Sequence, residues 1–174
     1  MANSTDLTAP RCGVLAPAFA LPDVARPADA EPLRLRAWRQ RRPVLLAPLP
    51  AAAGEQRVAW LRALAERGVA LDEAQVVTLA VAGGDRAAAR ALWSRAGALF
   101  PLLSDAEGAT LAAYLGSGAT RPALAVIDRY SVLLALLPAP DATSGPDLDA
   151  ALREFAFAEQ EDCACGLPAW PEGE

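Results

Sequence analysis

The alternation of short apolar runs with helical patterns constrains the fold of this chain more than any other feature. Five apolar runs have the length of strands: residues 43–49, 75–82, 99–103, 123–128 and 132–138. Such runs are typical of strands buried on both faces, although the apolar pattern alone does not exclude a helix. A short turn, Arg129 to Ser131, separates the last two runs, which predicts an antiparallel hairpin.

Helical periodicity fills the intervals between these runs. The predicted helices cover residues 55–67, 86–96, 106–115 and 147–161. We expect Asp85 to cap the second helix and Gly68 to end the first. Strands that alternate with helices predict an α/β fold, in which a mixed but mainly parallel central sheet is flanked by helices. In that sheet we expect these side chains to be buried: Leu45, Val77, Leu79, Leu124 and Val126.

The chain is long enough for one domain with a hydrophobic core, but short for two. It has 174 residues, of which 53% are hydrophobic and 21% are charged, as expected for one globular domain. We assign residues 13–161 to this domain and residues 1–12 to a flexible N-terminal segment. Residues 162–174 form a tail with a C-x-C motif, too rich in glycine, proline and acidic residues to extend the last helix.

The charge composition argues against several classes of function. A formal net charge of -5 and a pI of about 4.8 argue against nucleic acid or an anionic membrane as the main partner, because phosphates are bound through clustered positive charge. The sequence contains no histidine and no lysine, which excludes an imidazole ligand, a Ser–His pair and a Schiff-base lysine. No pattern implies a cofactor. The polar first residues and the lack of the roughly 20 apolar residues of a membrane helix predict a cytoplasmic protein.

Three segments resemble the AhpC/TSA family of peroxiredoxins and redoxins. GVLAPAFALPD is similar to the opening of that family, and LFPLLSDAEGATLAAYLG to its fPlLsD segment and the helix ending in Tyr-Gly, here Tyr114 and Gly116. RPALAVIDRYSVLLAL resembles the family's IDrdG hairpin, with Ile127 and Asp128 in place. These matches span most of residues 13–138. The resemblance implies a thioredoxin-like (redoxin) fold.

The resemblance also implies the location of a catalytic site. The family places a peroxidatic cysteine in the turn after the first core strand, and thioredoxin-like relatives place C-x-x-C there. In this sequence the turn reads AAAGEQ, residues 51–56. Aligning Arg57 with the arginine that often follows such a pair puts Ala53 and Gln56 at the two cysteine positions. We therefore predict that the family site is vacant and that the protein is not an efficient peroxidase.

Pro122 is a second position that the resemblance singles out. It directly precedes the run at residues 123–128, where thioredoxin-like folds carry a cis-proline facing the active turn. A trans proline at the start of a strand is the alternative, and both remain open at this point.

The three cysteines lie near the two ends of the chain, as Cys12, Cys163 and Cys165. Their small number fits a reducing compartment, and the odd count leaves at least one thiol unpaired within a monomer. The C-terminal pair has three interpretations: redox pair, soft-metal site, or incidental thiols whose acidic neighbours disfavour the thiolate. Cys12 is either a further redox thiol or an incidental surface thiol. The sequence alone does not place the two ends of the chain relative to each other.

Arginines and tryptophans supply the remaining candidate features. An arginine cluster precedes the first apolar run: Arg34, Arg36, Arg39, Arg41 and Arg42. It is either a solvated face or a site for an anion or an acidic partner. We expect Trp38, Trp60 and Trp93 to lie in the core. We expect Trp170 to pack on the domain or on a second copy, because tails rarely carry a tryptophan that does not dock.

Two classes of function follow from these features. The first is a thiol–disulfide oxidoreductase or redox sensor that works through Cys163 and Cys165, together with Cys12, and reacts with a thiol reductant or a partner protein. The second is a non-catalytic redoxin-fold protein that binds a partner or forms a homodimer. Soft-metal binding by Cys163 and Cys165 is a further alternative, and no other metal site is predicted.

Overall fold

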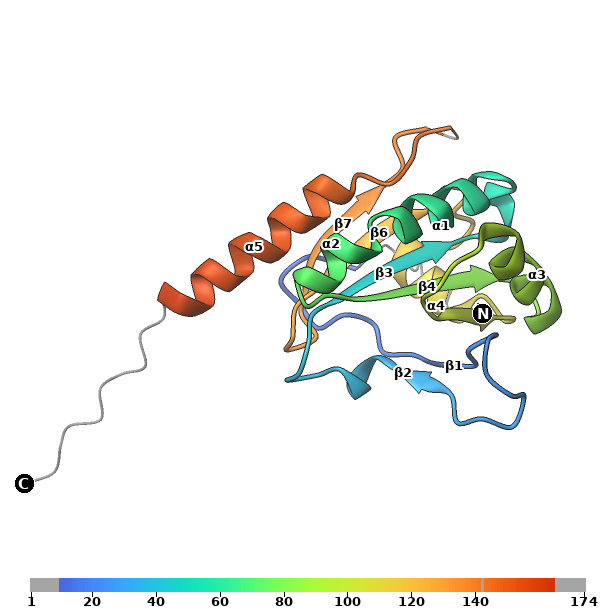
Figure 1. The fold of residues 1–174 in the computed structure, drawn as a ribbon, viewed down its shortest axis with the longest axis horizontal. Coiled ribbons are helices and arrows are strands. Elements are labelled where there is room, and N and C mark those ends of the chain that lie inside the picture. Colours follow the sequence, from blue (N-terminus) through green and yellow to red (C-terminus); the bar gives the residue numbers. More distant parts are fainter. Residues whose placement is uncertain (1–9, 142, 165–174) are drawn as a thin grey trace, which may run out of the picture.

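The computed structural model describes residues 10–141 and 143–164, and it describes side chains as far as Ala158. A central sheet of five strands runs through the domain in the order β5-β4-β3-β6-β7 (Figure 1). Its strands are β3 Val44–Leu49, β4 Val77–Gly83, β5 Leu102–Asp105, β6 Ala123–Ile127 and β7 Leu133–Pro138. The strands β3, β4 and β5 are parallel neighbours, and β6 is antiparallel to both β3 and β7. The predicted mixed α/β sheet is confirmed.

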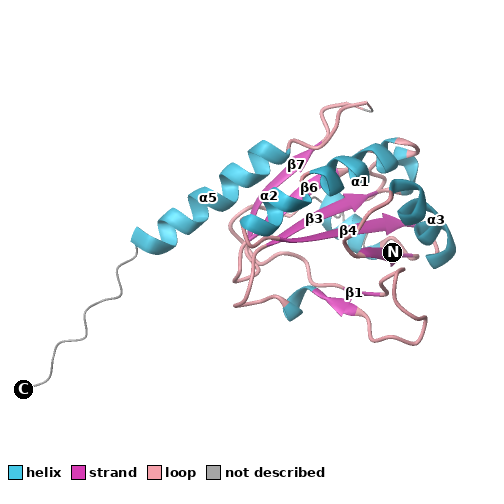
Figure 2. Ribbon diagram, in the orientation of Figure 1, coloured by secondary structure: helices cyan, strands magenta, loops and turns pink. Residues whose placement is uncertain are grey.

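Helices cover both faces of this sheet (Figure 2). They are α1 Gln56–Glu66, α2 Gly68–Glu73, α3 Arg86–Ala96, α4 Ala109–Leu115 and α5 Leu148–Ala164, with 3-10 turns η1 Leu35–Ala37 and η2 Ala51–Ala53. Successive strand residues point to opposite faces, so Leu45 packs under α1, α2, α3 and α5 while Leu46 packs under α4. Trp60 and Tyr114 are the largest fully buried side chains of the two cores.

The N-terminal segment protects both edges of the sheet. Leu15 bridges Val132 just before β7, and Asp23 bridges Leu103 on the outer edge of β5. Between these bridges lies a strand that the sequence analysis missed, β1 (Ala20–Leu21), which pairs with β2 (Leu33–Arg34). A covered edge offers no free backbone groups to another chain. The segment therefore covers the outer edge of β5 and the beginning of the outer edge of β7.

Several local predictions are confirmed and others are wrong. Asp85 caps α3 by accepting a hydrogen bond of 2.8 Å from the backbone N–H of Ala88. The helix α1 ends at Glu66, just before Gly68 as predicted. Gly68 is not left-handed, however, and the short helix α2, which was not predicted, begins there. Val77 is only partly buried, since it opens β4 at the exposed end of the sheet, and Val76 is buried in its place at 2% exposure.

Further differences concern the ends of elements and the tryptophans. The helix α5 continues to Ala164 rather than ending at residue 161, because the first glycine comes only at Gly166. The strand β5 begins at Leu102, three residues later than expected, and Leu99 is 95% exposed. The other four sheet residues predicted to be buried are buried. Of the three tryptophans predicted to lie in the core, Trp60 is fully buried. Trp93 is partly buried against the same core as Trp60, and Trp38 is partly buried against the core on the other face of the sheet.

Within residues 10–141 and 143–164, no helix is long and apolar enough to cross a membrane.

Candidate functional site

The turn between β3 and α1 lies where the parallel strands end. Pro50 and the 3-10 turn η2 follow β3 directly, and Gly54 then takes φ 53° and ψ -129°, a conformation that favours glycine. The helix α1 begins at Gln56. The carboxyl ends of parallel strands are the usual place for a site in an open α/β sheet. The turn formed by Ala51 to Glu55 lies at this edge of the sheet.

Gly83 at the end of β4 allows this turn to lie close to the sheet. A Cβ atom at position 83 would come within 2.9 Å of Leu111 Cδ1 and 3.1 Å of the backbone nitrogen of Ala51. A larger residue here would push the Leu111 side chain aside and shift the backbone at Ala51 by a few tenths of an ångström. Glycine therefore allows the turn and α4 to lie close to the end of β4.

A hollow of about 270 Å³ lies beside the turn. Its lining includes Pro50, Ala51, Gly83 and Gly108, and its ionisable side chains are Asp105 and Glu107. The Asp105 carboxylate is 3% exposed and accepts a hydrogen bond of 2.8 Å from the backbone N–H of Leu111. This carboxylate is therefore occupied in holding the start of α4. None of the residues that line the hollow carries a thiol.

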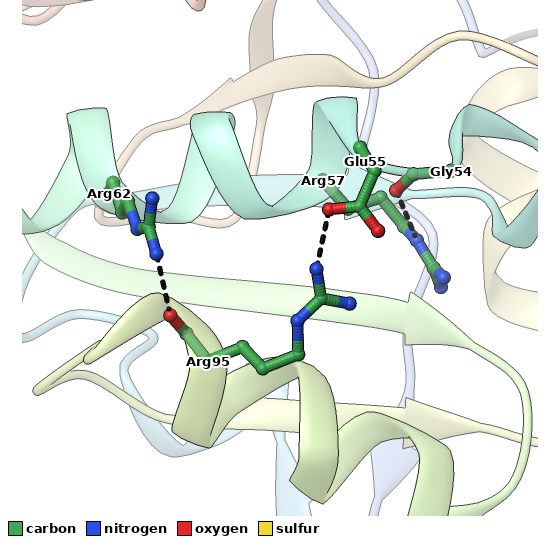
Figure 3. Close-up of polar contacts among 5 residues, drawn as sticks. All are labelled: Gly54, Glu55, Arg57, Arg62 and Arg95. Carbon is green, nitrogen blue, oxygen red and sulfur yellow. Dashed lines mark hydrogen bonds and ion pairs between the residues drawn. The ribbon is translucent and has the colours of Figure 1, made fainter.

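Arg57 braces the backbone of the turn (Figure 3). Its Nε donates to the carbonyl of Gly54 at 3.3 Å, and its Nη1 donates to the carbonyl of Gly83 at 3.4 Å. An arginine beside a thiolate would lower the pKa of that thiol. Here the guanidinium group instead connects the turn to the end of β4.

An ion pair joins the start of α1 to α3. Arg95 Nη2 donates to Glu55 Oε2 at 2.5 Å, and Arg62 Nη2 donates to the Arg95 carbonyl at 3.0 Å (Figure 3). The hydrogen bond from Arg95 and its positive charge hold the pKa of Glu55 below its ordinary value. Both partners of the ion pair are exposed, so its contribution to stability is small. These contacts link α1 to the last turn of α3.

Gln56 anchors a distant loop. Its side chain is 9% exposed, and Nε2 donates to the carbonyls of Asp141 at 3.0 Å and Ser144 at 2.9 Å. Trp60 Nε1 donates to the same Ser144 carbonyl at 2.8 Å. Of the two positions aligned with family cysteines, Ala53 is a half-buried residue of η2 and Gln56 has this structural role.

The loop that receives Gln56 is organised around one carboxylate. Asp141 accepts hydrogen bonds of 2.7–2.8 Å from the backbone N–H and the hydroxyl groups of Thr143 and Ser144. These hydrogen bonds hold the pKa of Asp141 far below its ordinary value. This role of Asp141 was not predicted, although Asp followed by Thr and Ser in a loop is a signal for such a turn.

The cis alternative for Pro122 is wrong. Among the described residues no peptide bond is cis. Pro122 is buried just before β6, and its carbonyl accepts a hydrogen bond of 2.9 Å from Ala139 N–H. A trans proline fits the start of a strand, because no ladder hydrogen bond is required from its nitrogen there.

Of the three candidate cysteines, the structure describes the side chain of Cys12 alone, and this residue lies away from the turn at residues 51–56. Cys12 is an exposed free thiol, and the neighbouring Gly13 N–H donates to the Leu133 carbonyl at 2.8 Å. Cys12 is thus held beside the first residues of β7. Cys163 lies in the last turn of α5, with its side chain outside the described residues, and Cys165 and Trp170 lie outside them altogether.

A second hollow links the β7 edge to α5. Its volume is about 250 Å³, and its lining includes Arg42, Asp128, Leu134, Phe155 and Ala158. Arg42 lies two residues before the start of β3, whereas the turn at residues 51–56 follows the end of β3. The structure therefore places Cys12 and the second half of α5 toward the end of the sheet opposite to that turn. Within the described part, no three His, Cys, Asp or Glu side chains gather as ligands for a metal ion.

Comparisons with known proteins agree with this architecture. The AhpC/TSA family model matches residues 12–135. The 2-Cys peroxiredoxin of Plasmodium vivax, in its reduced form, superposes with a TM-score of 0.73 at 22% identity, over 94% of this chain and 90% of its own. The peroxidoxin BcpB of Mycobacterium tuberculosis superposes with a TM-score of 0.69 at 20% identity, over 84% of this chain and 96% of its own.

A third known structure shares the same fold. A candidate protein disulfide isomerase from Bacteroides thetaiotaomicron superposes with a TM-score of 0.60 at 21% identity, over 88% of each chain. A search of curated protein sequences returns no match. The structural likenesses confirm the thioredoxin-like fold, which carries sites of many kinds.

Proposed function

Because the chain belongs to the AhpC/TSA family, we propose that it is a thiol–disulfide redox protein whose reacting groups are Cys12, Cys163 and Cys165. The turn at residues 51–56, where family resemblance implies the reacting cysteine, contains no thiol. Arg57 and Gln56 have structural contacts there instead. The chemistry of the family therefore has to use the thiols at the two ends of this chain.

One observation carries this proposal: Cys12 is exposed and is held at the same end of the sheet as the second half of α5. The Gly13 N–H donates to the Leu133 carbonyl, and the next residue of β7, Leu134, lines a hollow together with Phe155 and Ala158 of α5. Cys163 follows Ala158 on the same helix. Cys12 and Cys163 thus belong to neighbouring segments of the domain, and Cys165 follows Cys163 by two residues in the sequence.

The proposed reaction is exchange with a disulfide of a small thiol or of a partner protein. One cysteine thiolate attacks a sulfur atom of that disulfide, forms a mixed disulfide and releases the first thiolate. A second cysteine thiolate then attacks the mixed disulfide, closes a bond between the two cysteines and releases the second thiolate. Two electrons pass to the oxidant disulfide, and the two released thiolates take up the protons that the cysteines lost.

A thiol titration tests this proposal. After exposure to glutathione disulfide, we expect the reduced protein to lose two of its three free thiols and to regain them on treatment with a thiol reductant. In the variant Cys163→Ser/Cys165→Ser, Cys12 should form only a mixed disulfide with glutathione, because no second cysteine of the chain is left to resolve it. Three thiols that remain free in the unmodified chain would contradict a redox function.

A non-catalytic binding role is the second candidate, because one groove exposes apolar side chains. Leu99 is 95% exposed and Val69 is 73% exposed, and both line a hollow of about 460 Å³ beside α2 and the start of β4. Contiguous exposed apolar surface is typical of a protein–protein contact. If this groove forms a homodimer, sedimentation should show a dimer that Leu99→Ser dissociates, whether or not the cysteines are present.

A further inference from the structure

The arginine cluster forms a distinct positive surface on an acidic protein. Five arginines and no acidic residue lie within residues 34–42, although the chain has a net charge of -5. Together with Arg26, most of them line a hollow of about 660 Å³: Arg34, Arg36, Arg39 and Arg41. The single carboxylate of this lining belongs to Glu31.

Part of this positive charge is already neutralised. Arg34 lies 3.4 Å from Glu31 Oε1, and Arg42 lies 3.7 Å from Asp72 while donating to the Gln75 carbonyl at 2.8 Å. The remaining members are exposed, and their guanidinium groups have no hydrogen-bond or ion-pair partner among the described residues: Arg36, Arg39 and Arg41. Three adjacent guanidinium groups without counter-charges favour an anionic ligand.

The backbone fixes this cluster in place. Leu35 in η1 is 4% exposed and anchors the segment in the core, and Trp38 O accepts hydrogen bonds from the backbone N–H groups of Arg41 and Arg42. Gln40 adopts φ 61°, a left-handed backbone conformation that is uncommon outside glycine, and its N–H donates to the Arg129 carbonyl. The arginines are therefore presented from a tight turn with defined geometry.

The middle of the helix α5 lies near this cluster. Arg41 and Arg42 line the 250 Å³ hollow together with Phe155 and Ala158, and Arg41 also lines the larger arginine-rich hollow. In Figure 1 the second half of α5 extends beyond the sheet on the side where β3 begins. The chain that follows Ala158 thus starts beside the arginines.

The composition of residues 159–174 matches this surface. The segment contains five acidic residues and no arginine: Glu159, Glu161, Asp162, Glu172 and Glu174. We propose that the acidic C-terminal segment, residues 159–174, binds in the same chain to the cluster of Arg36, Arg39 and Arg41. The ion pairs are individually weak at an exposed surface, but several form together and the ligand is tethered.

The reach of the segment permits this contact. From Ala158 to Ala164 the helix advances by about 9 Å, and residues 165–174 can span up to about 33 Å when extended. Docking would bring Cys163 and Cys165 beside guanidinium groups, which favour the thiolate form. Docking would therefore make these two thiols more reactive in the proposed redox function, although the docking itself does not require the cysteines to react.

Limited proteolysis tests the docking in the full-length reduced chain. The variant Arg39→Gln/Arg41→Gln removes two unpaired arginines of the cluster, and Arg11→Gln/Arg90→Gln removes two exposed arginines elsewhere as a charge-matched control. At low ionic strength we expect a glutamate-specific protease to cleave after Glu172 at least about fivefold faster in the first variant, because cleavage follows the undocked population. The control should behave like the unmodified chain.

Three outcomes decide the proposal. Equal cleavage rates in all three proteins would overturn it, once thermal unfolding shows that both variants are folded. Protection that rises with protein concentration would overturn docking within one chain and indicate a second copy as the partner. Protection that persists in Cys163→Ser/Cys165→Ser supports docking independently of the redox proposal, so the two can fail separately.

Discussion

The side-chain amide of Gln56 donates a hydrogen bond of 2.9 Å to the carbonyl of Ser144, 88 residues further along the chain. This bond ties the first turn of α1 to the loop before α5, and Trp60 strengthens the connection with a bond to the same carbonyl. The position that family resemblance aligns with a cysteine therefore helps to build the domain. A glutamine here supplies two donors that a thiol would not supply.

Removal of this anchor should destabilise the protein. In Gln56→Ala the carbonyls of Asp141 and Ser144 each lose a partner, so we expect the free energy of unfolding to fall by about 1–3 kcal/mol. Urea denaturation measures this change. Glu66→Ala, an exposed residue of the same helix, is the control and should stay within about 0.5 kcal/mol of the unmodified protein. Equal stabilities for the two variants would show that the anchor contributes nothing.

The Asp141 loop predicts a pH dependence of stability. Hydrogen bonds from Ser144 and Thr143 hold the pKa of Asp141 below the value of 3.8 expected in the unfolded chain. A lowered pKa means that the stabilisation is present above about pH 4 and is lost as the pH falls further. Asp141→Asn should therefore be less stable than the unmodified protein at neutral pH, and the difference should shrink in strong acid. Asp29→Asn, at an exposed position, should show no such pattern in urea titrations.

The attachment of the N-terminal segment depends on Tyr114. Its buried hydroxyl donates to the Pro17 carbonyl at 2.8 Å, so Tyr114→Phe should cost about 1–3 kcal/mol of stability. Burial also raises the pKa of Tyr114 above its ordinary value of 10.0. Because the folded state holds this proton more tightly, its stability should fall as the pH rises above about 10. Tyr130→Phe, at a 42% exposed position, should leave urea denaturation almost unchanged.

A cysteine placed in the turn should become reactive. We predict that the unmodified protein lacks efficient peroxidase activity. We also predict that Ala53→Cys, made in a variant with the three native cysteines changed to serine, creates a thiol with a pKa below about 8.5. The reason is that this thiol would lie next to the start of α1. Ala65→Cys, half-buried in the last turn of α1, is the matched control and should have a higher thiol pKa. The pH dependence of alkylation compares the two. Rapid peroxide consumption by the unmodified chain would contradict the first part of this prediction.

The sequence predicted the layout of the sheet because buried strands leave long apolar runs, as in β3 and β6. It could not predict the role of Gln56, whose partners are backbone carbonyls that only tertiary packing brings near. The end of the first helix near Gly68 was predicted within one residue, but the short helix α2 that begins at Gly68 was not, because six residues give little periodic signal. The short strands β1 and β2 have two residues each and give almost no periodic signal.

The candidate site, too, could be predicted from the sequence only in part. The location of the turn followed from the order of the predicted elements, and the absence of a thiol there is read directly from the sequence. That Cys12 lies at the same end of the sheet as the second half of α5 did not follow, because it depends on the N-terminal segment pairing with β7. Such edge pairing involves few residues and has no pattern of its own.

The most direct test of the redox account is tryptic peptide mapping after mild oxidation of the unmodified chain. A Cys163–Cys165 bond would close a very small ring and be easily reduced, so we expect the peptide that begins at Cys12 to be joined to the peptide that follows Arg153, within one chain or between two. Cys163→Ser/Cys165→Ser should abolish this product. A map dominated by a Cys163–Cys165 bond, or one in which all three thiols remain free, would contradict the account.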